Sequence, residues 1–325
     1  MLSILIVFVY VLRAFLSVPS SSFLFGKTAS QGKISMLTFN IWFSSVKMQE
    51  RMKALGQIVQ DLEPDILAFQ EVTRENLALL QKQRWFSRYY LIPPDVSKQG
   101  SYFVVILSLF PVDKWFIYPF KNSTYYNRKV VTAETKIAVS SSVRFVIATT
   151  HLLHAGFNTQ IRELQLKETL KVLSAYENVC VMGDMNINED RLHVDGDVIL
   201  PPSWIDAWLS LPGNTDSNGY TWDRSQNPFS RMGSSTNATS YKARLDRVLC
   251  KLSDFKVKEM RIVGNKLTKS NILPSDHFGL FTVIELSAKT VYKHVKKSQT
   301  EKEVFFKRPP NWEKLIDKEK VTSGS

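Results

Sequence analysis

Residues 130–151 read Val-Val-Thr-Ala-Glu-Thr-Lys-Ile-Ala-Val-Ser-Ser-Ser-Val-Arg-Phe-Val-Ile-Ala-Thr-Thr-His. The β-branched and apolar residues on either side of the three serines predict two strands, 130–139 and 143–149, that pair as a hairpin. An amphipathic pattern over 160–176 then predicts a helix, and 179–182 a further strand. A hairpin mixed with helix-connected strands disfavours a purely parallel sheet. We therefore predict an α/β (α+β four-layer) sandwich, in which two mixed β-sheets pack face to face with helices on the outside.

The same kinds of pattern continue along the chain in both directions. Apolar runs predict further strands at 33–39, 66–69, 101–107, 245–249 and 278–284, and amphipathic spacing predicts helices at 49–62 and 74–82. In the predicted helix 160–176, we expect five apolar residues to face inward, namely Ile161, Leu164, Leu166, Leu170 and Leu173.

Short polar signatures stand at the ends of these predicted strands. Four of them follow an apolar run and one precedes it: Asn40 in Leu-Thr-Phe-Asn, Glu71 in Phe-Gln-Glu-Val, His151 in Thr-Thr-His-Leu, Asp184 and Asn186 in Gly-Asp-Met-Asn, and Asp276 and His277 in Pro-Ser-Asp-His. Polar residues at strand ends can converge on one cleft, as metal ligands, acids and bases must. Together these signatures predict a metal-dependent phosphodiesterase.

Phosphodiester hydrolysis needs a cation on the phosphoryl oxygens, an activated water and stabilisation of the leaving oxygen. Hard oxygen ligands suit Mg²⁺, with Mn²⁺ as a substitute, and Glu71 is the best candidate for a direct ligand. No Cys/His spacing fits a zinc site, and no Gly-x-Ser-x-Gly elbow supports a serine nucleophile.

The remaining signatures supply acids, bases and hydrogen-bond donors. Asp184 and Asn186, two residues apart, fall on one side of an extended segment, where Asp184 can hold the attacking water and Asn186 can donate to the phosphate. Asp276 adds a second carboxylate. His277 is a candidate imidazolium, with Asp246 of Leu-Asp-Arg-Val as the carboxylate that orients it. We expect His151 to be a second cationic donor and the nearby His154 to be incidental.

Composition indicates a globular protein with three segments. The chain has 325 residues and 44% apolar content, which argues against disorder, and its net charge is +12. We predict a segment 1–32 for targeting or anchoring, a catalytic domain 33–287 and a basic, largely disordered tail 288–325. Because residues 1–49 carry four basic residues and no acid before Glu50, and the tail carries ten basic against five acidic residues, most of the excess charge lies at the ends.

The first segment leaves the compartment open. The apolar run 2–12, interrupted by Arg13, suits a secretory signal or anchor, and the lack of acids also allows an organellar presequence. Membrane association through residues 2–18 is one expectation, and the nucleus is another if this segment is not a signal. A monomer is the default expectation. The two cysteines, Cys180 and Cys250, lie in apolar runs and are expected to be small buried side chains without a disulfide framework.

Between about 33 and 285 these motifs resemble the endonuclease/exonuclease/phosphatase superfamily, which includes deoxyribonuclease I and the abasic-site endonucleases. Further motifs are similar to the tyrosyl-DNA phosphodiesterase 2 sub-family, namely Gly-Tyr-Thr-Trp222-Asp, Arg-Leu-Asp246-Arg-Val, Pro-Ser-Asp-His277-Phe-Gly-Leu, and Leu-Pro-Pro-Ser-Trp-Ile-Asp-Ala-Trp over 200–208. The resemblance implies a deoxyribonuclease I-like fold. It also implies hydrolysis of the bond between a tyrosine oxygen and a DNA 5′-phosphate, so that the partners are DNA ends or the adducts left by abortive topoisomerase 2.

The resemblance also implies roles for individual residues. Asn40 and Glu71 would lie at the magnesium site, with Asp276 beside the metal through water. Asp184 and Asn186 would position the water and the phosphate, and His151 and His277 would bind phosphoryl oxygens. Arg162 and Trp222 would face the substrate.

Two departures from the sub-family pattern put the substrate in question. The pattern Asn-Ile-Asp is Asn-Ile-Trp42 here, and Thr-His-Leu-Glu-Ser is Thr-His-Leu-Leu153-His154. Two other hypotheses therefore stand beside the first: another phosphodiesterase of the superfamily, either a general nuclease or a sphingomyelinase-like lipid enzyme, and a degenerate binding protein. The apolar N-terminus fits the lipid enzyme, whereas the complete set of acids and histidines disfavours the binding protein.

Overall fold

The computed structural model describes residues 32–121, 127–136, 143–154, 159–187, 200–232, 240–288 and 290. The predictions for 1–32 and 288–325 therefore fall almost entirely outside the described residues. Among the described residues, no helix is long and apolar enough to cross a bilayer.

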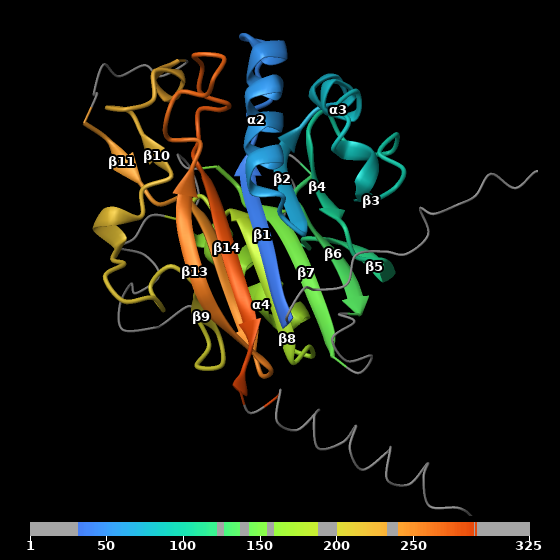
Figure 1. The fold of residues 1–325 in the computed structure, drawn as a ribbon. Coiled ribbons are helices and arrows are strands. Elements are labelled where there is room, and N and C mark those ends of the chain that lie inside the picture. The colour runs from blue at the N-terminus through green and yellow to red at the C-terminus, as the bar shows by residue number, and fades with distance from the viewer. Residues whose placement is uncertain are drawn as a thin grey trace, which may run out of the picture.

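Two six-stranded mixed sheets form the centre of the fold (Figure 1). The first sheet contains, in spatial order, β13 (Phe255–Val263), β14 (Gly279–Leu286), β1 (Lys33–Asn40), β2 (Ile66–Val72), β4 (Phe103–Ser108) and β3 (Tyr90–Ile92). The second contains β5 (Val112–Pro119), β6 (Lys129–Lys136), β7 (Arg144–His151), β8 (Asn178–Asp184), β12 (Asp246–Leu252) and β9 (Ile205–Asp206). A small third sheet pairs β10 (Trp222–Asp223) with β11 (Lys242–Ala243).

Helices cover the outer face of each large sheet. Helices α2 (Met48–Leu62) and α3 (Arg74–Gln81) pack on the first sheet, and α4 (Thr159–Leu173) packs on the second. The described part of the chain also contains three short 3₁₀ helices: η2 (Phe86–Arg88), η5 (Asp216–Asn218) and η6 (Phe229–Arg231). The predicted four-layer sandwich, with two mixed sheets inside and helices outside, is confirmed.

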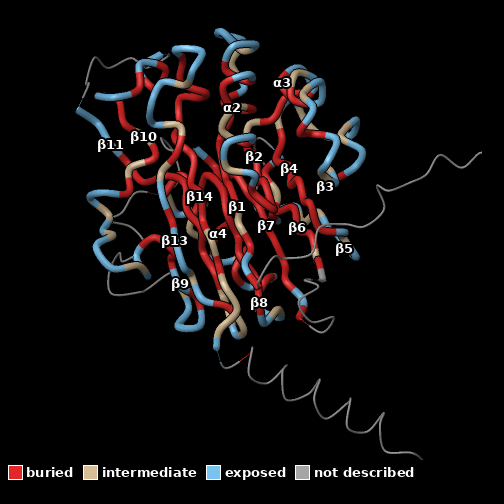
Figure 2. The backbone as a smooth tube through the Cα atoms, viewed as in Figure 1, coloured by how far each residue is buried: buried red, intermediate tan, exposed pale blue. Residues whose placement is uncertain are grey.

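The core lies between the two sheets because one face of each strand is apolar. On β1, Ile34 and Met36 point toward the second sheet, where Ile147 and Met182 meet them. The opposite face of β1 packs under α2. Since both faces of the inner strands are covered, these strands are largely buried, and exposed residues gather in the loops, the outer turns of the helices and the edge strands (Figure 2).

The inner face becomes polar toward one edge. There Gln70, which is fully buried, donates to Thr149 Oγ1 of the opposite sheet at 3.0 Å and to Thr38 Oγ1 of its own sheet at 3.1 Å. Buried polar groups need such partners. This network therefore links the two sheets next to the strand ends that carry the polar signatures.

Three sequence predictions need correction. Leu164 is 49% exposed, because the inward stripe of α4 runs through Leu166, Leu170 and Leu173 and a residue two positions away points elsewhere. Cys180 and Cys250 are buried as expected, but they face each other across β8 and β12 and form a disulfide. Strand pairing decides that contact, and a sequence separation of 70 gives no sign of it.

The third correction concerns strands that the pattern did not reveal. β13 lies between the predicted strands 245–249 and 278–284 in the sequence. It is an edge strand of the first sheet and contains both charged and apolar residues. β5 is likewise an edge strand, and it is largely exposed. Apolar content alone does not mark such strands, because only one of their faces needs to be buried.

Candidate active site

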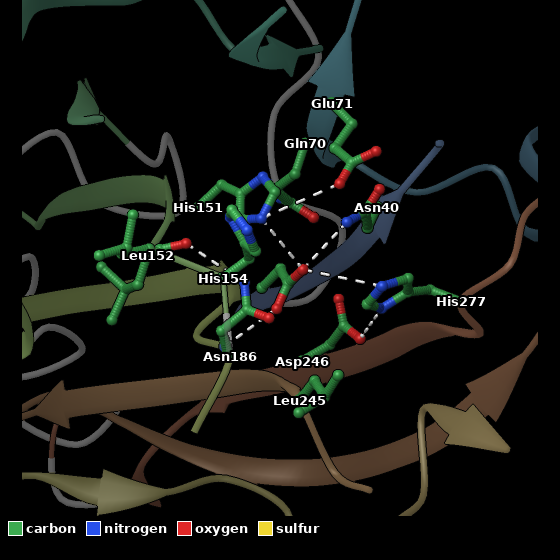
Figure 3. Close-up of polar contacts among 12 residues, drawn as sticks. Asn40, Gln70, Glu71, His151, Leu152, His154, Asn186, Leu245, Asp246 and His277 are labelled. Carbon is green, nitrogen blue, oxygen red and sulfur yellow. Dashed lines mark hydrogen bonds and ion pairs between the residues drawn. The ribbon is translucent and has the colours of Figure 1, made fainter. Parts of the chain in front are cut away.

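Strand direction brings the polar signatures together. β1 runs parallel to β2, and β7 runs parallel to β8, so Asn40, Glu71, His151 and Asp184 all stand at the carboxyl ends of their strands. β12 is antiparallel to β8 and begins with Asp246, directly opposite Asp184. The side chains of Asn40, Glu71, His151 and Asp246 point into the same space at one edge of the sandwich (Figure 3), and Asp184 lies among them, within 3.3 Å of Asn40 and His151.

Asp184 is the centre of the hydrogen-bond network. Its Oδ2 atom lies 3.0 Å from Asn40 Nδ2, 3.3 Å from His151 Nε2 and 3.7 Å from His277 Nε2. Its Oδ1 atom accepts the backbone N–H of Asn186 at 3.0 Å. This carboxylate is 2% exposed, so it is held in one orientation by partners from both sheets.

The backbone before Asp184 explains the glycine of the Gly-Asp-Met-Asn signature. Gly183 has φ 148°, and a Cβ added there would lie 2.1 Å from the carbonyl oxygen of Thr150 on β7. Only glycine allows this approach of the two parallel strands. Gly183 therefore lets His151 and Asp184 end their strands side by side.

His277 is held as an imidazolium. Its Nδ1 lies 2.8 Å from Asp246 Oδ2, and its ring meets Trp222 edge-on at 4.7 Å between centroids. Burial opposes the charged form, but the carboxylates of Asp246 and Asp184 outweigh it and raise the pKa of His277 to about 10. The protonated ring can therefore donate from Nε2 toward the cavity at neutral pH.

His151 differs from its predicted cationic state. Burial is the main cause that lowers its pKa well below the usual value, and the neighbouring Arg128 and His277 add to the effect. The ring is therefore neutral. It can still donate one hydrogen bond from Nε2, as its 3.3 Å distance to Asp184 indicates.

The acids suit a divalent cation. Ligand atoms of Glu71, His151 and Asp184 lie within 4.8 Å of one another. Burial, with Glu71 also contributing, raises the pKa of Asp276 to about 7, and burial raises that of Asp184 to about 6. Converging carboxylates with raised pKa values are stabilised in the ionised form by a nearby cation, and their hard oxygen atoms match Mg²⁺ chemistry.

Glu71 is directed into this cluster by its backbone. It has φ 56° and lies at an irregularity in the pairing of β2 with β4, and such bulges re-aim a side chain. Its Oε2 accepts the backbone N–H of Phe43 at 3.1 Å, and its Oε1 lies 4.0 Å from His151 Nε2.

Asn40 makes two contacts at the base of the cluster. Its amide nitrogen is the donor to Asp184, and its Oδ1 accepts the backbone N–H of Trp42 at 3.1 Å. In this arrangement Asn40 orients Asp184, and its oxygen retains a second lone pair for a cation.

We expect Mg²⁺ to raise the Tm of the wild-type protein, because a ligand that binds only the folded state stabilises it. In Glu71→Gln the rise should fall to near zero, since the amide lacks the charge that draws the cation. Differential scanning fluorimetry against Mg²⁺ concentration measures this. Glu63→Gln, on the exposed turn after α2, is the matched control and should keep the wild-type response. An unchanged rise in Glu71→Gln would contradict the assignment.

A cavity of about 480 Å³ opens above these residues. Its polar floor contains Glu71, His151, Asp184, Asn186, Asp276 and His277, and its walls contain Trp42, Phe43, His154, Trp222, Arg224, Ser230, Met232, Tyr241 and Leu245. The structure thus brings together in one cavity most of the site residues that the sequence singled out. Trp222 lies on the wall, as expected for a residue that faces the substrate.

Two nearby residues take positions that the sequence did not indicate. Arg162 is 6% exposed and is not among the described residues that line this cavity. Instead it donates to the carbonyl oxygen of His154 at 3.2 Å and to Thr159 Oγ1 at 3.0 Å. His154, expected to be incidental, lines the cavity beside the floor residues. Arg162 therefore helps to position the segment that carries His154.

Several positioning residues were missed by the sequence reasoning. Ser275 donates to the carbonyl oxygen of Asn40 at 2.6 Å, and Thr221 Oγ1 accepts the backbone N–H groups of Leu245 and Asp246 at 3.1 and 3.0 Å. Each is a buried hydroxyl within or beside a quoted signature. The sequence signal that could have indicated them is their place inside these two motifs, next to the acids.

The first departure, Trp42, has a structural explanation. The residue has φ 59°, and its ring packs against Arg51 at 4.7 Å and against Phe229 at 5.4 Å. It therefore fills a wall of the cavity at the position where the sub-family pattern has an acid. The second departure, Leu153, is buried, and its backbone N–H donates to Gln165 at 2.9 Å.

Residues 37–277 match the model of the endonuclease/exonuclease/phosphatase family. The chain belongs to this family. It is therefore a phosphodiester hydrolase, as the motifs predicted, and the degenerate-binding-protein hypothesis falls away.

Similar proteins point to one branch of the family. Two curated relatives, from Caenorhabditis briggsae and Caenorhabditis elegans, are named 5′-tyrosyl-DNA phosphodiesterase. Each is 26% identical over 259 residues, which cover 76% of this chain and 68% and 66% of the two relatives. The match thus spans about two thirds of each relative.

Solved structures support the fold. The crystal structure of truncated Caenorhabditis elegans TDP2 has a TM-score of 0.65 at 24% identity, covering 78% of this chain and 97% of that chain. D. rerio TDP2 complexed with a single-strand DNA product has a TM-score of 0.67 at 21% identity, covering 78% and 99%.

Proposed function

We propose that this chain is a Mg²⁺-dependent phosphodiesterase that hydrolyses 5′-phosphotyrosyl–DNA bonds, and so acts on DNA ends blocked by topoisomerase 2. The main observation is that His277 lies between two carboxylates, with Nδ1 2.8 Å from Asp246 and Nε2 3.7 Å from Asp184, and that His277, Asp184 and Glu71 all line the cavity. The names of the curated relatives support the substrate.

The protonation state of each residue at the floor of the cavity indicates its role in the reaction. Asp184, ionised and held by three donors, orients a water molecule and takes its proton. His277, kept protonated by Asp246, donates to the phosphoryl oxygen that gains charge. Neutral His151 has a single N–H, which holds Asp184 in this structure and can donate to the phosphate only in exchange for that contact. A bound Mg²⁺, held by Glu71 with Asp276 and Asn40 nearby, would neutralise the phosphate and stabilise the leaving oxygen.

Asn186 is placed to add another donor. Its backbone N–H is bound to Asp184, and its amide donates to the carbonyl oxygen of Leu152 at 3.2 Å. The second amide hydrogen remains for a phosphoryl oxygen. Since Asn186 also lines the cavity, we assign it to binding the scissile phosphate.

We expect the full-length protein with Mg²⁺ to release tyrosine from a 5′-phosphotyrosyl oligonucleotide, and EDTA to abolish the release. The panel should also contain an unmodified duplex, an unmodified single strand and sphingomyelin vesicles, with products followed by gel and by phosphocholine release. Asp184→Asn protein is the control for contaminating activity. Turnover of sphingomyelin with the phosphotyrosyl substrate left intact would establish the lipid enzyme instead. Internal cleavage of unmodified DNA at a similar rate would establish a general nuclease.

A further inference from the structure

We propose that Phe43 is a specificity-determining residue, whose ring stacks on an aromatic group attached to the scissile phosphate. The aromatic group is either the phenol of the tyrosyl leaving group or the first base of the DNA. This inference rests on the proposed function, because it names what the rim of that same cavity recognises.

Phe43 is exposed, yet its position is fixed. Its side chain is 50% exposed and lines the cavity. A single exposed aromatic residue is ordinary on a protein surface. This one is held from two sides: its backbone N–H donates to Glu71 Oε2 at 3.1 Å, and its ring stacks on Tyr102 at 5.4 Å with 19° between the planes.

The loop that carries Phe43 is also held rigidly. Arg51 of α2 is fully buried, and its guanidinium donates to the backbone carbonyl groups of Ile41, Trp42, Ser44 and Val46. It makes a further bond to the carbonyl of Pro274, next to the Asp276–His277 signature, at 3.3 Å. The loop is thereby joined both to the helix and to the opposite side of the active site.

Rigidity matters because ordering a side chain on binding costs entropy. A ring that is already fixed loses little freedom when it stacks on a ligand, which is why rigid aromatic residues serve as anchors in binding sites. Phe43 is fixed relative to Glu71, the candidate metal ligand, so a ring stacked on it would lie at a set distance from the phosphate.

The chemistry of the cavity favours an aromatic ligand at this place. Trp222, Met232 and Tyr241 form an apolar wall on the cavity, and Phe43 adds a further π-face beside Glu71. A phosphodiester bound at the floor has two substituents. A nucleoside and a tyrosine would each present a planar ring, and planar rings stack on aromatic side chains with little dependence on sequence.

The test compares Phe43→Ala, Phe43→Trp and Phe116→Ala with the wild type, in full-length protein with Mg²⁺. Phe116, on β5, is 52% exposed and does not line the cavity, so it is the matched control. Three substrates are compared. The first two, a 5′-phosphotyrosyl strand and a 5′-phosphoalkyl strand, have the same DNA sequence, and the third is the phosphoalkyl strand with an abasic first nucleotide. Each variant is compared with the wild type on the same substrate, so differences in leaving-group reactivity cancel.

We expect Phe43→Ala to lower kcat/KM about 5- to 10-fold on the phosphotyrosyl strand, mainly through KM, because lost stacking weakens binding. Phe43→Trp should retain activity, and Phe116→Ala should stay within about twofold. Loss on the phosphotyrosyl strand alone identifies the phenol as the stacked ring. If kcat/KM also falls on the alkyl strand but is unchanged on the abasic strand, the stacked ring is the base. Equal loss on all three, or no loss on any, would overturn the proposal.

Failure of the proposed function is distinguished by a second pair of substrates, bis(p-nitrophenyl) phosphate and methyl p-nitrophenyl phosphate. If the wild type cleaves none of the DNA strands, the proposed function fails. The stacking role is then decided by this pair, which differs by one aromatic ring. A larger loss for Phe43→Ala on the two-ring diester supports the role, and equal loss refutes it.

Discussion

Replacing Asp184 with asparagine is expected to lower kcat/KM for phosphodiester hydrolysis by about 10³-fold with little change in stability. The amide keeps the shape of the side chain, and its single oxygen can still accept the backbone N–H of Asn186, so the bond from Asn40 is lost and the removal of the buried charge offsets that loss. It cannot take a proton from water. The rate loss therefore reports the chemical role of this carboxylate.

The stability part of this expectation follows from the sign of the pKa shift. Burial raises the pKa of Asp184 to about 6, so its ionised form is disfavoured by folding, and that cost is present above pH 6. A neutral amide removes the cost. At pH 8 without metal, the Tm of Asp184→Asn should equal or exceed that of the wild type.

Asp61→Asn is the matched control, because Asp61 is an exposed carboxylate on α2 that bonds only a side chain of its own helix, Gln57, among the contacts described. It should leave kcat/KM unchanged. A near-normal rate in Asp184→Asn, in single-turnover measurements that exclude product release, would remove Asp184 from the catalytic role.

The second large effect is expected for Asp246→Asn, which should lower the rate at pH 8 by about 10-fold or more. The charge of Asp246 does most to raise the pKa of His277, and its Oδ2 lies 2.8 Å from Nδ1 of that ring. Without its charge, burial prevails and the imidazole loses its proton near neutral pH. The donor to the phosphate is then lost although the ring remains.

The pH dependence of kcat/KM separates this effect from a loss of packing. In the wild type the rate should hold up to about pH 10, where His277 loses its proton, and should fall on the acid side at or below about pH 6, where Asp184 becomes protonated. In Asp246→Asn the alkaline limb should move down to near neutral pH, while the acid limb moves little.

His277→Gln supplies the control for the pH experiment. It should be slow at every pH and show no alkaline limb, because the titrating donor is gone. If the alkaline limb of Asp246→Asn stays near pH 10, the imidazolium assignment is wrong.

Much of the site was predictable from the sequence, because its reactive residues lie in short local motifs. Glu71, Asp184 and His277 each follow or precede an apolar strand, and their residue types match what phosphodiester hydrolysis needs. Asp246 was predicted to orient His277, and the structure places the two within hydrogen-bond distance. Other features depend on contacts between distant segments. The protonation states of His151 and His277 differ because of the neighbours that folding gives each ring, and nothing in either signature distinguishes them.

Residue order alone determined the layered architecture, the strand ends that carry the acids and histidines, and the class of reaction, because periodicity and motif spacing are local properties of the chain. Tertiary structure decided what local properties cannot. Strand pairing joined Cys180 to Cys250, and packing set Arg162 against the carbonyl of His154 and brought Phe43 and His154 to the cavity wall. The reason is physical: burial, charge and contact at a site arise from side chains that are far apart in sequence, and only the folded chain sets their distances.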